Sequence, residues 1–158
     1  MSFSIKKLNE VDIEKTYNLF KELEILHSSK LPNIFKRPDE IEHIKEYVNN
    51  ALSNPNQIFF IAEIEGQPIG LIETLITKDG IKPVRVDREY AIIDKLIVKD
   101  EYRKLGVATS LIDTTESYLK EKGIKEVEIY VWDFNENAFN LYQNKGFTTL
   151  CRRMIKEI

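Results

Sequence analysis

The chain has 158 residues and a formal net charge of −3, and 42% of its residues are hydrophobic and 31% charged. This length favours a single domain over residues 1–158, and this balance excludes a disordered chain. A net charge so close to zero gives no reason to expect nucleic acid or an anionic membrane as a partner. One cysteine, Cys151, excludes an internal disulfide and a cysteine-rich metal site, and with only two histidines we expect no metal.

The longest uninterrupted apolar run is Ile58–Ala62, which is far too short to cross a bilayer. The chain reaches Glu10 and Asp12 without an apolar stretch, so we recognise no secretion signal. We therefore expect a cytoplasmic protein, in which Cys151 is buried and inert.

The first half of the chain predicts a short strand, two helices and a β-hairpin. Apolar residues alternate with polar ones from Phe3 to Ile5, and Asn9 is suited to cap the helix that follows. A second helix is predicted to begin near Pro38 and to carry a stripe of apolar residues as far as Leu52. Two apolar segments then flank a turn at Gly66-Gln67-Pro68, and these strands are predicted at Gln57–Glu65 and Ile69–Thr77.

The second half predicts strands and helices in alternation. After a charged connection at Lys78–Glu89, the segment Tyr90–Val98 has the Ile and Val content of a central strand. A helix is predicted to run to Lys122, with Gly123 at its carboxyl end. The remaining predicted elements are a strand at Val127–Trp132, a short helix from Asn135 to Gly146 and a last strand at Phe147–Ile155. The chain therefore predicts one α/β (α+β) domain.

The segment that follows Val98 carries the chemistry. A buried strand enters a turn, and the turn opens a helix whose first N–H groups have no partner inside the helix. The helix dipole makes this end positive, and the small residues Gly106 and Ala108 let a phosphate approach the backbone. The alternative is a plain strand-to-helix junction. The pattern lacks the Gly-Lys-Ser/Thr end of a nucleotide P-loop and is not G-x-G-x-x-G, which disfavours a nucleotide triphosphatase or a dinucleotide enzyme.

Two motifs resemble one family. Arg103-x-x-Gly106-x-Ala108, after a strand that ends in Leu96-Ile97-Val98, is similar to the acyl-CoA signature of the GNAT superfamily of N-acetyltransferases. Downstream, Phe134-Asn135-x-x-Ala138-x-x-Leu141-Tyr142-x-x-x-Gly146-Phe147 resembles the second common motif of that family. One helix and one strand separate the two motifs, as in the family. The resemblance implies a mixed, mostly antiparallel sheet with two splayed parallel strands and flanking helices.

The resemblance also implies where acetyl-CoA would lie, namely between the strands Tyr90–Val98 and Val127–Trp132. The backbone edge of Leu96, Ile97 and Val98 would hydrogen-bond the pantetheine amides like an added strand. Arg103 and Lys104 could add positive charge near the phosphates, and Asn135 would contact the pantetheine arm or only cap its helix. The backbone N–H groups expected to hold the pyrophosphate are those of Lys104, Leu105, Gly106, Val107, Ala108 and Thr109.

The implied reaction is direct attack of an amine on the acetyl thioester, which requires a base and an acid. Tyr142 resembles the acid tyrosine of the family. A phenol has a pKa of about 10, so it is protonated at neutral pH and could protonate the leaving thiolate. Tyr142 could instead only pack between helix and sheet. Asp94 lies in an apolar strand, where burial of a carboxylate costs free energy unless it is paired with a cation or solvated. Asp94 is our first candidate base. Glu73 also lies in an apolar strand, and the same argument makes it the second candidate base. Alternation along a strand places the neighbouring Lys95 on the opposite face from Asp94.

We expect an N-acetyltransferase that uses acetyl-CoA as co-substrate and a small-molecule or peptide amine as acceptor. The alternative is an acyl-CoA-binding sensor module without turnover. The sequence leaves open whether the chain forms a homodimer. Candidate walls for the acceptor, each of which could equally be core, are Tyr17, Phe20, His27, Pro32 and Phe35.

Overall fold

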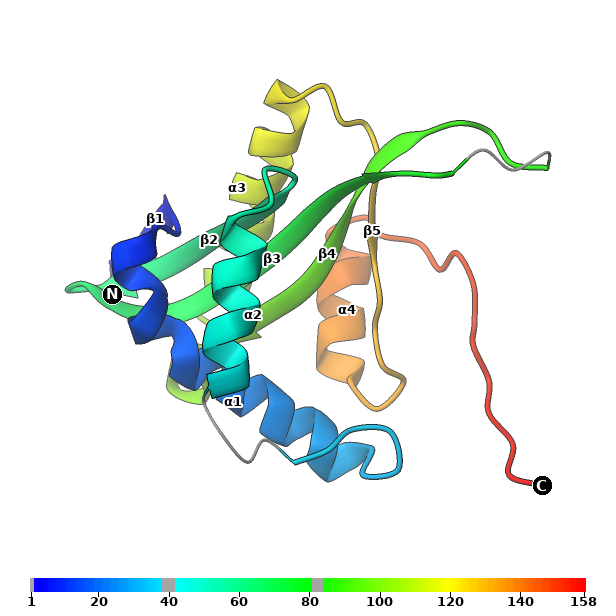
Figure 1. Cartoon of the computed structure of the whole chain (residues 1–158), viewed down its shortest axis with the longest axis horizontal. Helices are drawn as coiled ribbons and strands as arrows, with labels where there is room; N and C mark the ends of the chain where they lie inside the picture. The colour runs from blue at the N-terminus through cyan, green and yellow to red at the C-terminus, as the bar shows by residue number, and fades with distance from the viewer. Residues whose placement is uncertain (1, 38–41, 81–83) are drawn as a thin grey trace.

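The computed structural model describes residues 2–37, 42–80 and 84–158. Within these ranges strands and helices alternate largely as the sequence predicts (Figure 1). The strands are β1 (Ser4–Lys7), β2 (Gln57–Ile64), β3 (Gln67–Lys78), β4 (Glu89–Val98) and β5 (Val127–Ile129). The α-helices are α1 (Ile13–Lys30), α2 (Glu42–Leu52), α3 (Val107–Glu121) and α4 (Glu136–Asn144), and the short 3-10 helices are η1 (Glu10–Asp12) and η2 (Asp100–Tyr102). The predicted start of the second helix at Pro38 lies outside the described residues.

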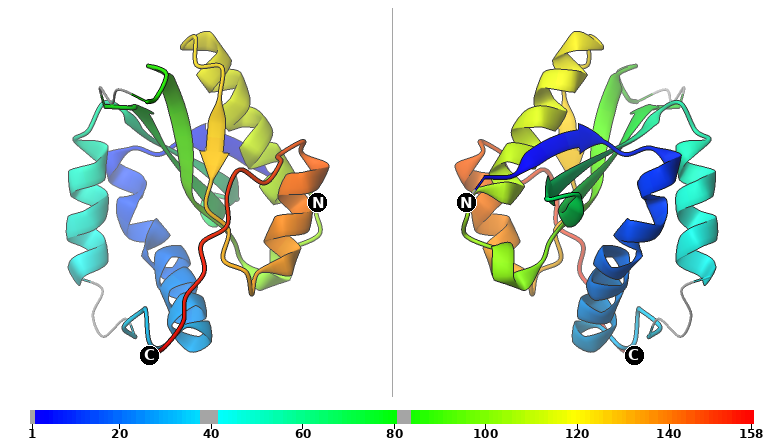
Figure 2. Two further views of the ribbon diagram at one scale, coloured as in Figure 1. Left: turned by 90° about the vertical axis from the view of Figure 1, so that its right-hand side faces the viewer. Right: turned by 90° about the vertical axis from the view of Figure 1, so that its left-hand side faces the viewer.

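The strands form one sheet in the order β1-β2-β3-β4-β5. Every neighbouring pair is antiparallel except β4 and β5, which are parallel. The predicted mixed, mostly antiparallel sheet is therefore confirmed. Helices α1 and α2 cover one face, and α3 and α4 cover the other (Figures 1 and 2).

The core consists of two apolar layers, one on each face of the sheet. Successive residues of a strand point to opposite faces, so Phe59 and Ile61 pack under α1 and α2 while Ile58, Phe60 and Ala62 pack under α3. This double burial explains why the longest apolar run of the chain lies in β2, since a strand covered on both faces needs no polar side.

The two parallel strands separate partway along their length. The pairing of β4 with β5 begins at Ala91 with Val127 and ends at Ile93 with Ile129. Strand β4 continues to Val98, still paired on its other side with β3 as far as Gly70. Beyond Ile93, the edge of β4 that faces β5 has no strand partner among the described residues. The predicted splay is thus observed, and it also explains why β5 ends at Ile129 rather than at the predicted Trp132.

The last predicted strand, Phe147–Ile155, is wrong. Residues 147–158 belong to no helix or strand, and residues 148–158 are exposed throughout. A strand needs a hydrogen-bonded neighbour, and within the described chain no backbone hydrogen bond joins residues 148–158 to another segment. The expected burial of Cys151 is wrong for the same reason, because its side chain is exposed.

Candidate active site

The turn after β4 is tied to the end of the strand by Arg103. The Arg103 Nε donates to the carbonyl oxygen of Val98 at 3.0 Å, and its terminal nitrogen lies 2.6 Å from the Asp100 carboxylate. Lys104 and Gly106 both adopt the left-handed region, with φ of 61° and 81°. A lysine is rarely found there, and such strain tends to persist where the surrounding structure uses it. Arg103 and the two residues fix a curved backbone that leads directly into α3.

This curve exposes a row of backbone amides. Residues 103–106 are exposed, and in the described part of the chain the N–H groups of Lys104, Leu105 and Gly106 donate to no other backbone carbonyl. The first N–H groups of α3, from Val107 onward, have no acceptor within the helix. The positive end of the helix dipole lies at the same place. The arrangement is suited to a diphosphate.

Gly70 is a positioning residue that sequence analysis missed. A Cβ on Gly70 would lie 3.1 Å from the carbonyl oxygen of Ile97, 3.1 Å from Val107 Cγ1 and 3.3 Å from Leu111 Cδ1. Only glycine lets β3 approach both the end of β4 and the first turns of α3 this closely. An isolated glycine inside a strand is a signal for such close approach, and it was available in the sequence.

Beyond Ile93 the unpaired edge of β4 faces the gap that opens between β4 and β5, and only alternate residues direct their backbone N–H and C=O groups into this gap. The Lys99 N–H donates to the Ile69 carbonyl on β3 at 3.0 Å, which makes Lys99 and Ile69 a hydrogen-bonded pair. By alternation, Ile97 directs its backbone groups to β3, whereas Leu96 and Val98 direct theirs away from it, toward β5. The Val98 carbonyl already accepts from Arg103, so the free groups at the gap are the Val98 N–H and both backbone groups of Leu96.

A β-bulge lies at Asp94. Glu73 pairs with Lys95 and Thr74 pairs with Ile93, so Asp94 is the extra residue of β4. A bulge breaks the alternation of side chains, and bulges are common next to active sites. The Lys95 ammonium accordingly lies 2.5 Å from the Asp94 carboxylate, and the prediction that these two side chains point to opposite faces is wrong.

Lys95 joins the exposed carboxylate of Asp94 to a buried one. Its Nζ lies 3.0 Å from Glu73 Oε2 and donates to the Tyr47 hydroxyl at 2.7 Å. The Tyr47 hydroxyl and the Gln57 side-chain amide both donate to Glu73 Oε1. Burial alone would lower the pKa of Lys95, but the Glu73 carboxylate and the hydrogen bonds to Asp94 and Tyr47 raise that pKa above its ordinary value. Lys95 is therefore a permanent cation.

Glu73 and Asp94 differ in their access to solvent. The Glu73 side chain is completely buried beneath Tyr47 and Lys95, whereas half of the Asp94 side chain is exposed. An incoming amine can meet Asp94 without a rearrangement of the sheet, and it cannot meet Glu73. This burial disfavours the second candidate base. Tyr47 and Gln57, which hold Glu73, have no local sequence signal, because they come from α2 and from the start of β2.

Tyr142 lies on the other face of the sheet. It is 7% exposed and belongs to the apolar cluster that holds Ile93, Val98 and Val107, with its ring edge-on to Phe147. Burial raises the pKa of Tyr142 to about 12, so its hydroxyl is protonated at neutral pH. Asn135 caps the same helix, because its Oδ1 accepts from the Ala138 N–H at 3.2 Å. The predicted capping role is confirmed, and the Asn135 side-chain nitrogen makes no hydrogen bond to the residues that the structure describes.

Aromatic side chains join the end of α1 to the segment after β5. His27 stacks on Phe35 with ring centroids 5.1 Å apart, and Trp132 and Phe134 meet His27 edge-on. Burial and the nearby Lys95 ammonium lower the pKa of His27, which keeps the imidazole neutral at neutral pH. Of the other expected acceptor walls, Phe20 is core and Pro32 is exposed.

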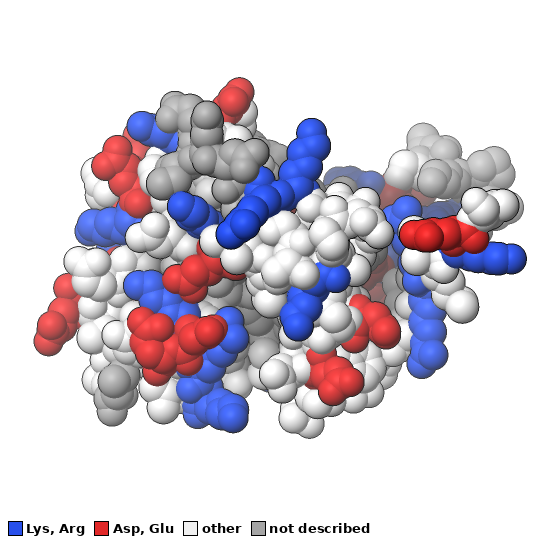
Figure 3. All heavy atoms as spheres, turned by 90° about the horizontal axis from the view of Figure 1, so that it is seen from below, with Lys and Arg blue, Asp and Glu red and all other residues white. Residues whose placement is uncertain are grey.

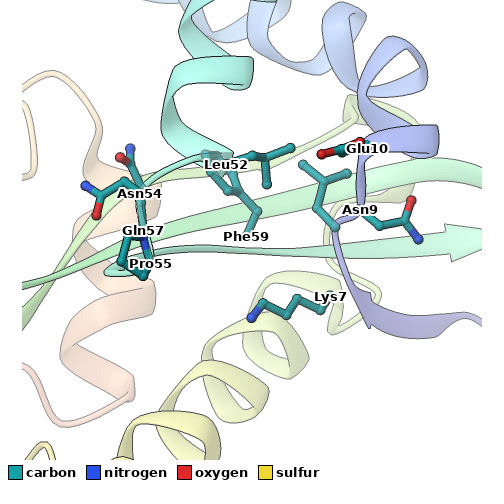
Figure 4. A pocket seen from close by; sticks show the side chains of 9 residues that line it. Lys7, Asn9, Glu10, Leu52, Asn54, Pro55, Gln57 and Phe59 are labelled. Carbon is teal, nitrogen blue, oxygen red and sulfur yellow. The ribbon is translucent and has the colours of Figure 1, made fainter.

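Two concave surfaces of the described chain lie away from this site. A cavity of about 280 Å³ is lined by residues of β1, η1, the end of α2 and the start of β2, including Lys7, Leu52 and Phe59 (Figure 4). No residue of the turn after β4 lines it. The face seen in Figure 3 shows Lys and Arg interspersed with Asp and Glu, rather than a basic stripe. Among the described residues no acidic, histidine or cysteine cluster could hold a metal ion, and no helix is long and apolar enough to span a membrane.

Three features characterise this domain: two parallel strands that separate, a turn lined with backbone amides, and a tyrosine buried in an apolar cluster. Together they are typical of an α/β domain of the acyltransferase type. Residues 19–147 match the sequence pattern of the Acetyltransferase (GNAT) family. This match covers most of the chain, so the protein belongs to the GNAT acetyltransferase family.

Curated relatives include an N-alpha-acetyltransferase of Sulfurisphaera tokodaii, which is 31% identical over 112 residues, or 68% of this chain and 61% of the relative. An uncharacterized N-acetyltransferase of Methanocaldococcus jannaschii is 32% identical over 89 residues, which cover 56% of this chain and 38% of that protein. The chain thus spans about four to six tenths of the length of these relatives.

Solved structures confirm the fold. The BH1408 protein of Bacillus halodurans, solved as a tetramutant, superimposes with a TM-score of 0.88 at 17% identity, over 98% of this chain and 99% of that one. The aminoglycoside N-acetyltransferase AAC(6')-Iy, in complex with CoA, superimposes with a TM-score of 0.79 at 20% identity, over 99% of this chain and 95% of that one. At these identities the likeness concerns the fold.

Proposed function

We propose that this single domain transfers the acetyl group of acetyl-CoA to a primary amine of a small molecule or peptide by direct attack. The observation that carries the proposal is the unpaired edge of β4 beyond Ile93, which leads into a turn of free backbone amides. The edge suits an extended chain of amides, and the turn suits a diphosphate. Coenzyme A has both parts in this order.

The residues of the turn and the strand fit the coenzyme. The N–H groups of residues 104–109 would bind the pyrophosphate. The Leu96 backbone would pair with the pantetheine amides, and the Val98 N–H would polarise the thioester carbonyl. Ile97 contributes its side chain to the core instead, since its backbone groups are directed to β3. The Asn135 amide nitrogen would donate to the pantetheine arm.

Tyr142 is proposed as the acid. Its hydroxyl makes no hydrogen bond to the described part of the chain and lies in an apolar cluster that keeps it protonated. A thiolate formed beside it can take the phenol proton as the C–S bond breaks. A general acid in such a position contributes about 10²-fold or more to the rate.

Asp94 is proposed as the base, acting directly or through water. Its carboxylate is accessible, whereas the alternative carboxylate of Glu73 is covered. The Lys95 ammonium orients Asp94 and is itself held by Glu73 and Tyr47. An alkyl ammonium has a pKa of about 10.4 and must lose a proton before it attacks. The half-exposed carboxylate can attract the cation and receive that proton.

The proposal is tested by the release of free CoA thiol from acetyl-CoA with a panel of polyamines, aminoglycosides, amino acids and peptides. We expect release that depends on the acceptor, and calorimetry should show binding of coenzyme A in its absence. Binding without release for any amine would favour the non-catalytic sensor module. No heat of association would refute both functions.

A matched pair of variants distinguishes the two candidate bases. Asp94→Asn should move the alkaline-rising limb of the pH profile of turnover to higher pH, because the amine must then lose its proton unaided. Glu73→Gln keeps the shape of the side chain and one oxygen that can accept from Tyr47 and Gln57, although it removes the ion pair with Lys95, and it should leave that limb where it is. A shift in the Glu73 variant alone would reverse the assignment.

A further inference from the structure

The Lys95 ammonium is surrounded by as many oxygen atoms as it has N–H donors. A lysine ammonium carries three N–H groups. The Lys95 Nζ lies 2.5 Å from Asp94 Oδ2 and 3.0 Å from Glu73 Oε2. It also donates to the Tyr47 hydroxyl at 2.7 Å and lies 4.3 Å from the centroid of the same ring. Because these oxygens match its donors, Lys95 is not free to bind the carboxylate of a substrate.

The charges of this cluster do not cancel. Glu73 and Asp94 are both acidic and only Lys95 is basic, which leaves a surplus negative charge. Glu73 is completely buried and half of the Asp94 side chain is exposed, so the surplus faces solvent at Asp94. Asp94 contacts Lys95 through Oδ2, and within the described residues no hydrogen bond or ion pair engages its Oδ1. Asp94 therefore keeps one carboxylate oxygen for a ligand.

The buried carboxylate of Glu73 confines the Lys95 ammonium to partners within the protein. The Tyr47 hydroxyl and the Gln57 amide both donate to Glu73 Oε1. The other oxygen, Oε2, is thereby turned toward Lys95. If Lys95 were paired with Asp94 alone, it would neutralise that carboxylate and could turn one N–H toward a bound substrate. Glu73 therefore determines which charge the exposed end of the cluster presents.

The neighbouring aromatic cluster adds no positive charge. His27 stacks on Phe35, and Trp132 lies edge-on to both rings. Burial and the charge of Lys95 lower the pKa of His27, so the imidazole is neutral at neutral pH and lies within the electrostatic reach of the ammonium. A ligand that extends from Asp94 toward this cluster would therefore meet neutral rings rather than a second cation.

We propose that the acceptor is a cationic amine with no carboxylate on the carbon that bears the nitrogen, such as an alkylamine, a polyamine or a peptide amino terminus, and that Glu73 enforces this preference. The inference rests on the proposed acetyl transfer and narrows its acceptor class. The Asp94 oxygen attracts the ammonium, whereas the carboxylate of a free α-amino acid would lie near the same negative charge while Lys95 is occupied. A peptide carries a neutral amide at that carbon and avoids the repulsion.

Amino acids and their carboxamides test the proposal as matched pairs, because the two members have nearly the same shape and differ in the charge beside the amine. Release of CoA thiol is measured with alanine, leucine and phenylalanine and with the carboxamide of each. In the wild type kcat/KM should be higher for the carboxamide by about tenfold or more, the effect of one interaction with a charged group.

Glu73→Gln should remove most of this preference. The amide oxygen of a glutamine would accept from Tyr47 and Gln57, so its nitrogen would face Lys95 and turn the ammonium toward the substrate. The ratio of the two kcat/KM values should then fall by about tenfold. The members of a pair also differ in the basicity of their amines, but this difference is the same for both enzymes and cancels in the comparison.

Glu63→Gln is the matched control. Glu63 is also a buried glutamate that pairs with a lysine, Lys6, at 3.1 Å, but it lies in β2, which β3 separates from β4, so the preference should not change. Tyr47→Phe keeps the ring and frees Lys95 from the hydroxyl alone, so it should lower the preference less than Glu73→Gln does, and it decides the matter if that variant does not fold.

The outcomes separate this inference from the function on which it rests. A wild type that acetylates free amino acids as well as their carboxamides overturns the inference, and so does a preference that persists unchanged in Tyr47→Phe and in folded Glu73→Gln. Absence of release with every amine of the wider panel would instead refute the proposed acetyl transfer, and this inference with it.

Discussion

Replacement of Gly70 by alanine tests how closely β3, β4 and α3 are held at the amide-lined turn. The new Cβ would lie 3.1 Å from the Ile97 carbonyl oxygen and from Val107 Cγ1. Overpacking of this kind costs about 1–3 kcal/mol, and the loss of glycine freedom in the unfolded chain returns about 0.5–1 kcal/mol. We expect a net loss of about 1–2 kcal/mol, or roughly 3–6 °C in Tm for a chain of this size.

The same strain should weaken binding of the coenzyme. Ile97 and Val107 flank the turn on either side, and Ile97 can relieve the contact with its carbonyl only by moving the backbone that leads into the turn, whereas Val107 can also move its side chain. If about half of the strain falls on the turn, affinity for coenzyme A should drop about threefold. Thermal melts and calorimetry with coenzyme A measure the two effects on the same sample.

Two other glycines separate crowding from backbone conformation. Gly80 has no atom within 4 Å of an added Cβ and no left-handed φ, so Gly80→Ala should change neither measurement. Gly106 also has open space but a φ of +81°, so Gly106→Ala should cost about 1 kcal/mol through conformation alone. Should Gly70→Ala melt and bind like Gly80→Ala, the close approach would not position the turn, and the reasoning would fail.

Three further outcomes follow from the site and its surroundings. Tyr142→Phe should reduce kcat about 10²-fold while calorimetry shows coenzyme affinity close to wild type; unchanged turnover across pH would remove Tyr142 as the acid. Lys95→Met leaves the buried Glu73 carboxylate without its cation and should lower the free energy of unfolding, measured by urea titration, by about 3 kcal/mol. A loss below about 1 kcal/mol would mean that the hydrogen bonds from Tyr47 and Gln57 are enough to stabilise the carboxylate. Hydrogen bonds from Lys6 and Lys15 lower the pKa of the buried Asp12, so its stabilising effect is present above the ordinary pKa of about 4 and is lost as pH falls through the folded value; in Asp12→Asn that acid-dependent loss in Tm should be smaller.

The order of the elements was predictable because it depends on local pattern. Helical spacing, the cap at Asn135 and the hairpin turn at Gly66 each involve residues close in sequence, and each is found in the structure. The mixed sheet and its splay came from the resemblance of the two motifs. Hydrophobic pattern alone would not have shown that pairing with β5 stops at Ile93.

The arrangement around Asp94 was not predictable by the same means. Alternation along a strand assumes regular pairing, and one extra residue in β4 invalidates it locally. The partners of Glu73 are equally non-local, since Tyr47 is 26 residues before it and comes from a helix on the face above. The predicted last strand, Phe147–Ile155, was wrong for the opposite reason. Its local preference for a strand is strong, but strand formation depends on a neighbour that the described residues do not provide.

The sheet also gives the proposed acid, Tyr142, and the proposed base, Asp94, different environments. Tyr142 lies in the apolar layer beneath α3 and α4, where burial favours the neutral phenol. Asp94 lies at the bulge in β4, half-exposed and beside the Lys95 ammonium. In an unbroken sheet the backbone ladder would separate these environments. Because the pairing of β4 with β5 ends at Ile93, we propose that a thioester bound between the two strands reaches both groups, so that the splay would serve the reaction as well as the binding of the coenzyme.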